Sequence, residues 1–121
     1  VTRGKVGGYN NGGGIYYESI SGTLLLSDVN VFDNSAKYGG GVYVREGSAT
    51  LSGGQIISNF ANNGGGIYYT NIAGTLLLSD VNVFDNSVVY NGGGVYIQQG
   101  SATLSGGQII SNLADNNGGG V

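Results

Sequence analysis

A triplet of glycines recurs along this chain of 121 residues at a nearly constant interval. The triplets begin at residues 12, 39, 64, 92 and 118, so that the intervals are 27, 25, 28 and 26 residues. The longest identical stretches lie two intervals apart. Residues 22–35 have the same sequence as 74–87, and residues 47–59 the same sequence as 100–112. The chain therefore consists of units of about 26 residues that alternate between two types, and such a fixed period is the signature of a repeat architecture.

Apolar residues within each unit alternate with their neighbours instead of recurring at helical spacing. Leu24 and Leu26 show this alternation in the first unit, and Gly or Asn interrupts the chain about every dozen residues. β-branched and aromatic residues dominate between these breaks, as in strands. We therefore predict three short strands in each unit, at Ile15–Tyr17, Thr23–Ser27 and Val29–Asp33 in the first. Three strands joined by tight turns at a constant period predict an all-β parallel β-helix, or β-solenoid, of 4–5 coils.

The repeat also divides the chain. We expect a single β-solenoid domain over residues 1–121, with a divergent partial coil at 1–11, coils at 12–38, 39–63, 64–91 and 92–117, and the start of a further coil at 118–121. The near identity of alternate coils indicates a longer array made by duplication, of which this chain is a fragment. Both ends carry the sequence NNGGG and neither carries a polar capping segment. We therefore expect open edges, which invite another chain to pair.

Alignment of the coils places equivalent residues in rows that would stack about 4.8 Å apart. We predict that three apolar rows form the interior: Ile15, Val42, Ile67 and Val95; Leu26, Leu51, Leu78 and Leu104; Val31, Ile56, Val83 and Ile109. A fourth row contains only asparagine: Asn34, Asn59, Asn86 and Asn112. We interpret this row as a ladder of side-chain amides at a turn, with Asn in the left-handed conformation that it tolerates. Turn preference without a ladder is the alternative. The glycine triplet is predicted to be the corner of each coil, where only Gly accepts the required φ cheaply.

Three further rows are expected to face outward. One is aromatic: Tyr16, Tyr43, Tyr68 and Tyr96. One is apolar: Phe32, Ile57, Phe84 and Ile110. The third face carries Thr, Ser and Leu, including Thr23, Leu25, Thr50, Thr75, Leu77 and Thr103. Contiguous exposed apolar rows usually mark interaction surfaces, and coverage by turns or by neighbouring repeats is the alternative.

The glycine corner and the asparagine turn resemble the GGAI and FxxN repeats of polymorphic outer membrane proteins and related autotransporter-type β-helices. The first motif is matched by Gly12–Ile15, Gly39–Val42, Gly64–Ile67 and Gly92–Val95, and the second by Val31–Asn34, Ile56–Asn59, Val83–Asn86 and Ile109–Asn112. The Phe of FxxN is Val or Ile in every coil. The resemblance implies a right-handed parallel β-helix on the surface of a cell or secreted from it. It does not specify an activity, since this fold hosts adhesins and polysaccharide enzymes alike.

The composition argues against several kinds of site. The chain has no His or Cys, only four basic residues and a net charge of −3, so that we expect no zinc site and no nucleic-acid partner. No apolar run is long enough for a transmembrane helix. Asp28 and Asp80 are equivalent positions two coils apart, roughly 9.6 Å from the stacking distance, at the edge of the carboxylate spacing for glycoside hydrolysis. We interpret them as solubilising residues, and Asp28, Asn30 and Asp33 only loosely resemble a calcium loop.

We therefore expect a non-enzymatic structural or adhesive segment of a bacterial or archaeal cell-surface or secreted protein, with no cofactor and no metal. It would act through stacked side-chain rows, with neighbouring repeats, a host surface or a glycan as partner. One alternative is a self-assembling subunit of a filament. Another is an ice- or polysaccharide-binding face, although Leu25 and Leu77 interrupt its Thr row. A polysaccharide lyase or hydrolase is the least favoured alternative.

Overall fold

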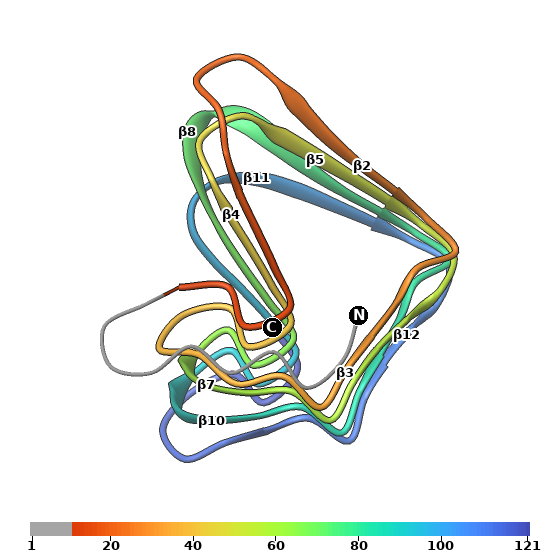
Figure 1. Ribbon diagram of the computed structural model, residues 1–121. Helices are drawn as coiled ribbons and strands as arrows, with labels where there is room; N and C mark the ends of the chain where they lie inside the picture. The colour runs from red at the N-terminus through yellow and green to blue at the C-terminus, as the bar shows by residue number, and fades with distance from the viewer. Residues whose placement is uncertain (1–10) are drawn as a thin grey trace.

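The computed structural model describes residues 11–121, which form a stack of parallel coils. Figure 1 looks along the stack, and successive coils lie over one another around a roughly triangular outline. The described residues form no helix, and every strand pairing among them is parallel. The chain is thus a β-solenoid of about four turns with about 26 residues per coil, as the glycine period predicted. Most of the divergent coil expected at 1–11 lies outside the described residues.

One sheet covers two sides of the triangle (Figure 1). Its strands are β1 (Ile15–Glu18), β2 (Thr23–Ser27), β4 (Val42–Arg45), β5 (Ser48–Ser52), β8 (Ile67–Ser79) and β11 (Val95–Ser105). In the first two coils, the strand after the glycines and the next strand are separate, as predicted. In the last two coils, they merge into the long strands β8 and β11, because hydrogen bonding continues through the bend between the two sides.

Two smaller sheets close the coil. The second sheet contains β3 (Asn30–Phe32), β6 (Gln55–Ile57), β9 (Asn82–Phe84) and β12 (Gln108–Ile110), and the third contains β7 (Phe60–Asn63), β10 (Ser87–Asn91) and β13 (Leu113–Ala114). The strands of the third sheet were not predicted. Their segments differ from coil to coil in length and residue type, whereas parallel pairing uses only their backbone groups. The side-chain pattern therefore carries no signal for this sheet.

The three predicted apolar rows contribute to the core, except that Leu104, in the last coil, is 42 % exposed. Val31, Val42, Ile67, Val83 and Val95 are at most 1 % exposed and belong to a single buried cluster. A further inward row, Tyr17–Val44–Tyr69–Ile97, alternates rings with smaller side chains. Tyr69 is fully buried, and its hydroxyl donates a hydrogen bond to the Gly47 carbonyl at 3.2 Å. The buried cluster also contains Val44, Ala49, Leu76 and Val81, which lie outside the three predicted rows.

The glycine triplet forms the corner of each coil, and two different reasons require glycine there. The first glycine alone has a positive φ, +63° at Gly64, which L-residues adopt only at a cost. The third lies under the next coil: a Cβ on Gly66 would be 2.5 Å from the Gly94 carbonyl oxygen. The prediction of an unusual φ therefore holds for one glycine of the triplet, and close stacking of the backbones explains the third.

Candidate interaction faces

A ladder of buried asparagine amides connects the four coils beside the core. Asn34 donates to Asn59 Oδ1 at 3.0 Å, Asn59 to Asn86 Oδ1 at 3.0 Å, and Asn86 to Asn112 Oδ1 at 2.9 Å. The Nδ2 of Asn59 also donates to the Val31 carbonyl at 3.0 Å. Asn34, Asn59 and Asn86 are at most 1 % exposed. Since a buried amide without partners is costly, the ladder holds the coils in one register.

The backbone at this turn differs from the expectation. The left-handed residue is the one before each asparagine: Asp33, Ser58, Asp85 and Ser111, with φ between 52° and 55°. The asparagines themselves are not left-handed. The turn thus directs the Asn side chain inward, where its amide meets the carbonyls of neighbouring coils. A short polar residue such as Asp tolerates the left-handed region.

A second, partly exposed asparagine ladder precedes the glycine corners, and it was not predicted. Asn91 donates to Asn63 Oδ1 at 3.1 Å, and Asn117 donates to Asn91 Oδ1 at 3.1 Å. Tyr38 occupies the same row one coil earlier. The repeated letters NNGGG, at 62–66 and 116–120, were the available signal. This ladder explains why Asn precedes most of the corners.

The tyrosine row forms a stack of rings along the outside of the first sheet. Adjacent ring centroids are 5.3 Å apart for Tyr16–Tyr43, 5.0 Å for Tyr43–Tyr68 and 5.2 Å for Tyr68–Tyr96. Tyr38 lies against Tyr68, at 5.2 Å. Because the rings cover one another, Tyr43 and Tyr68 are only 6 % and 5 % exposed, whereas Tyr16 is 47 % exposed. The expectation of a fully exposed aromatic row was therefore wrong for its two central members.

Burial changes the acidity of these tyrosines. It raises the pKa of Tyr68 and Tyr43 above the usual value of 10, since the phenolate would be poorly hydrated there. The Tyr68 hydroxyl donates to Gln98 Oε1 at 2.6 Å. The faces of the central rings are occupied by their neighbours, so that a ligand meets ring edges and hydroxyl groups instead of a flat aromatic platform.

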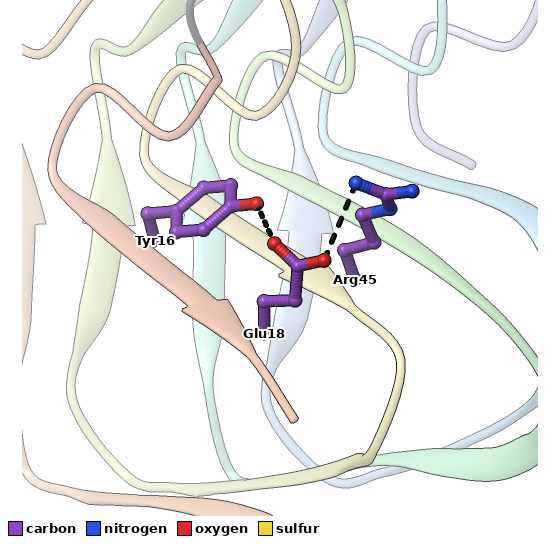
Figure 2. Close-up of polar contacts among 3 residues, drawn as sticks. All are labelled: Tyr16, Glu18 and Arg45. Carbon is purple, nitrogen blue, oxygen red and sulfur yellow. Dashed lines mark hydrogen bonds and ion pairs between the residues drawn. The ribbon is translucent and has the colours of Figure 1, made fainter. Parts of the chain in front are cut away.

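Tyr16, Glu18 and Arg45 form a polar cluster at the N-terminal end of this stack (Figure 2). The Tyr16 hydroxyl donates to Glu18, and Arg45 Nη1 lies 3.3 Å from Glu18 Oε1. The hydrogen bond to Glu18 is the main cause that raises the pKa of Tyr16, and the charge of Glu18 raises the pKa of Arg45. All three side chains are exposed, so that screening by water limits what the pair contributes to stability.

A shallow groove of about 680 Å³ runs beside the tyrosine stack. Three coils supply its polar lining: Arg45, Glu46, Thr70, Asn71, Gln98 and Gln99. Ile20 and Ile72, which are 90 % and 80 % exposed, flank it, and Tyr43 contributes to its wall. Amide, hydroxyl and guanidinium groups thus converge on one depression. No single repeat motif encodes this groove, because its members come from the variable segments at residues 43–46, 70–72 and 98–99 and from Ile20, where the coils differ in sequence.

The other predicted outward rows also lie in register. Leu25, Thr50, Leu77 and Thr103 stand opposite one another along the stack. Leu25 is 72 % exposed, and Thr50 and Leu77 are half-buried. Thr23 and Thr75 are exposed on the same face, where Ser48 and Ser101 are their partners in register. In the apolar row, Phe32 and Ile110 are exposed, while Ile57 and Phe84 are half-buried. An interaction role for either row stays a prediction.

The aspartates at the corner after the second strand alternate with glycines. Asp28, Gly53, Asp80 and Gly106 occupy equivalent places in successive coils, and all four have positive φ. The Asp28 carboxylate lies over Gly53, where a side chain would collide with it. Adjacent coils therefore never carry carboxylates at the same place, which would be destabilising. The same geometry makes the two coil types complementary to each other.

Within residues 11–121, no group of three or more His, Cys, Asp or Glu side chains could hold a metal ion. The described part of the chain also has no helix that is long and apolar enough to cross a membrane. Comparison of the sequence and the structure with known protein families, curated proteins and solved structures gives no match. The fold and the outer faces define the class of protein: it is a β-solenoid repeat protein whose outer surface carries stacked rows of side chains.

Proposed function

We propose that the chain is a non-enzymatic structural and adhesive segment of a cell-surface or secreted bacterial or archaeal protein. The groove beside the tyrosine stack supports this proposal, because convergent polar groups with apolar flanks suit a binding surface. Two amide ladders and the stacked rings support the structural part. They connect each coil to the next and suit a rod that keeps its faces aligned.

The groove suits a hydroxyl-rich polymer better than a charged one. Arg45 is paired with Glu18, Glu46 is the other charged side chain of the lining, and its remaining polar groups are neutral amides and a hydroxyl. Such groups exchange hydrogen bonds with sugar hydroxyls without leaving a buried charge. A neutral polysaccharide is therefore the ligand class that we assign to this surface.

Binding to a glycan array tests the proposal. We expect the wild-type chain to bind a subset of neutral glycans, and the double substitution Arg45→Ala with Gln99→Ala to weaken binding at least tenfold. Thr103→Ala with Leu25→Ala, on the other outward face, is the matched control and should bind like the wild type. Absence of binding to every glycan, or equal binding by both variants, contradicts the adhesive role.

A filament-forming subunit is the second candidate, because residues 22–35 are identical to 74–87, the segment that pairs with 47–59 inside the stack. An ice-binding face is less favoured, because exposed Leu25 and half-buried Leu77 interrupt the Thr row; thermal hysteresis measurements test it. A polysaccharide enzyme is the least favoured, and turnover of pectin or related glycans would support it.

A further inference from the structure

The bend between the two sides of the first sheet is longer in every second coil. From the outward tyrosine to the Thr or Ser that begins the second side, the chain advances seven residues in the first and third coils and five in the second and fourth. The pairing of β8 with β11 shifts its register here, between Gln99 and Ser101. Each longer bend carries an isoleucine, Ile20 or Ile72, that is largely exposed. An apolar side chain therefore recurs beside the groove with the period of two coils.

Hydrogen bonds hold the longer bend of the third coil in place. Asn71 Nδ2 donates to the Gly47 carbonyl of the preceding coil at 2.6 Å, and Asn71 Oδ1 accepts from the Ala73 amide at 3.1 Å. The Tyr69 hydroxyl donates to the same Gly47 carbonyl at 3.2 Å. Ile72 lies between the two bonded residues of this bend, and 80 % of it is exposed. Since its backbone is already ordered, little conformational entropy is lost when a ligand covers this side chain.

The groove beside the tyrosine stack runs along the axis of the solenoid. Arg45, Thr70 and Gln99 lie in register in three successive coils, so that they form a polar row parallel to that axis. The tyrosine stack borders this row on one side, because Tyr43 lies two residues before Arg45 on β4. The longer bends border the other side. The groove is therefore a channel with a polar floor, one aromatic wall and aliphatic side chains along the other wall.

We propose that this channel holds a single extended polysaccharide chain with the linkage of cellulose, lying along the axis of the solenoid. The inference rests on the glycan binding put forward as the proposed function, and it adds the linkage and the direction of the ligand. Neighbouring sugars in such a chain are turned over relative to each other, so that its structure repeats every two sugars. Ile20 and Ile72 lie two coils apart, roughly 9.6 Å by the stacking distance, and one such repeat has nearly the same length.

A cellulose-type chain is a flat ribbon whose two kinds of surface match the two kinds of side chain in the channel. The faces of its sugar rings present C–H groups, which pack against aliphatic side chains such as Ile72. Its edges present hydroxyl groups, which exchange hydrogen bonds with Arg45, Thr70 and Gln99 in the polar row. A glucan that coils, such as amylose, keeps these contacts over fewer coils of a straight channel. The channel should therefore select its ligand by linkage.

Titration calorimetry with three glucose hexamers tests the linkage. Cellohexaose, maltohexaose and laminarihexaose have the same composition and no charge, and they differ only in how the sugars are joined. We expect cellohexaose to bind at least tenfold more tightly than the other two. Cellotetraose should also bind more tightly than cellobiose, because the channel extends over several coils. Equal affinity for the three hexamers overturns the inference.

Ile72→Ser tests the aliphatic contact. This variant should bind cellohexaose at least fivefold more weakly than the wild type, whereas Ile72→Leu should keep the affinity. Leu25→Ser is the matched control, because Leu25 is 72 % exposed and lies on the other outward face. Ile72 and Leu25 are both exposed, so that the variants should fold like the wild type, as checked by circular dichroism. Equal binding by Ile72→Ser and Leu25→Ser overturns the inference.

The pattern of glycan binding separates this inference from the adhesive role on which it rests. Binding of several neutral glycans without a preference for cellohexaose leaves the adhesive role intact and overturns the assigned linkage. Absence of binding to every neutral glycan contradicts both. Preference for cellohexaose that is lost in Ile72→Ser and kept in Leu25→Ser supports both.

Discussion

Single residues act in this protein through the coil above and the coil below. Asn59 is the clearest case, because its amide donates to Asn86 and to the Val31 carbonyl, and its Oδ1 accepts from both nitrogens of Asn34. All of these partners belong to other coils. One side chain therefore connects three levels of the solenoid.

We predict that Asn59→Ala lowers the free energy of unfolding by about 3 kcal/mol, because it leaves several buried polar groups without partners. Urea denaturation followed by circular dichroism measures this loss. Asn116→Ala is the matched control: Asn116 is exposed, and the change should cost well under about 0.5 kcal/mol. Equal losses in the two variants would contradict a stabilising ladder.

The glycine corner provides a second prediction about individual residues. A Cβ on Gly66 would be 2.5 Å from the Gly94 carbonyl oxygen and 3.0 Å from Val83 Cγ1. Gly66→Ala should therefore lower the stability by roughly 2 kcal/mol or more through overpacking. Thermal or urea unfolding of this variant and the wild type measures the loss of stability.

Gly120 is the natural control for this substitution. It is also the third glycine of a triplet, yet a Cβ there would meet only Ile109 Cγ2, at 3.6 Å. Gly120→Ala should be neutral or slightly stabilising, because Ala restricts the unfolded chain. If both alanines were tolerated equally, close stacking would not be the reason for the third glycine.

Among the structural elements, the tyrosine stack on the first sheet couples stability to pH. The pKa values of Tyr43 and Tyr68 are raised in the folded state by burial. At pH values between the tyrosine pKa in the unfolded chain, near 10, and the raised pKa in the folded chain, the folded chain holds more protons than the unfolded chain. The stabilisation is thus fully present below about pH 10 and is lost as the pH rises above it.

We predict that the free energy of unfolding falls more steeply between about pH 9 and 11.5 in the wild type than in Tyr68→Phe, which has no phenol to ionise at the buried position. Urea unfolding across this range, with ultraviolet absorbance to follow phenol ionisation, measures the difference. Tyr90→Phe, at an exposed tyrosine, is the control and should keep the wild-type slope. If the free energy of unfolding fell equally steeply with pH in the wild type and in Tyr68→Phe, burial would not raise the pKa of Tyr68.

The whole molecule depends on two alternating coil types. Asp28 lies over Gly53, and the same pair recurs at Asp80 and Gly106. The Asp of one coil type therefore lies against the Gly of the other, and a stack of the Asp-bearing type alone would place carboxylate beside carboxylate.

Stacking of a repeated sequence explains how much could be predicted. Equivalent residues in successive coils share one environment, so that the Leu, Val/Ile and Asn rows identify the core and the ladder from the order of the amino acids alone. The strands with alternating residues, Thr23–Ser27 above all, were correct for the same reason.

Features that break the repeat required the tertiary structure. The third sheet pairs backbone segments whose side chains share no pattern, and the left-handed residue at the Asn turn follows from the inward direction of the amide. Burial of Tyr43 and Tyr68 depends on rings above, below and beside them, including Tyr38 from outside the row. The groove is built by variable residues of successive coils, such as Arg45, Asn71 and Gln99. Periodicity thus specifies the coil and its core, whereas the outer surface depends on how the non-repeating residues of different coils meet in space.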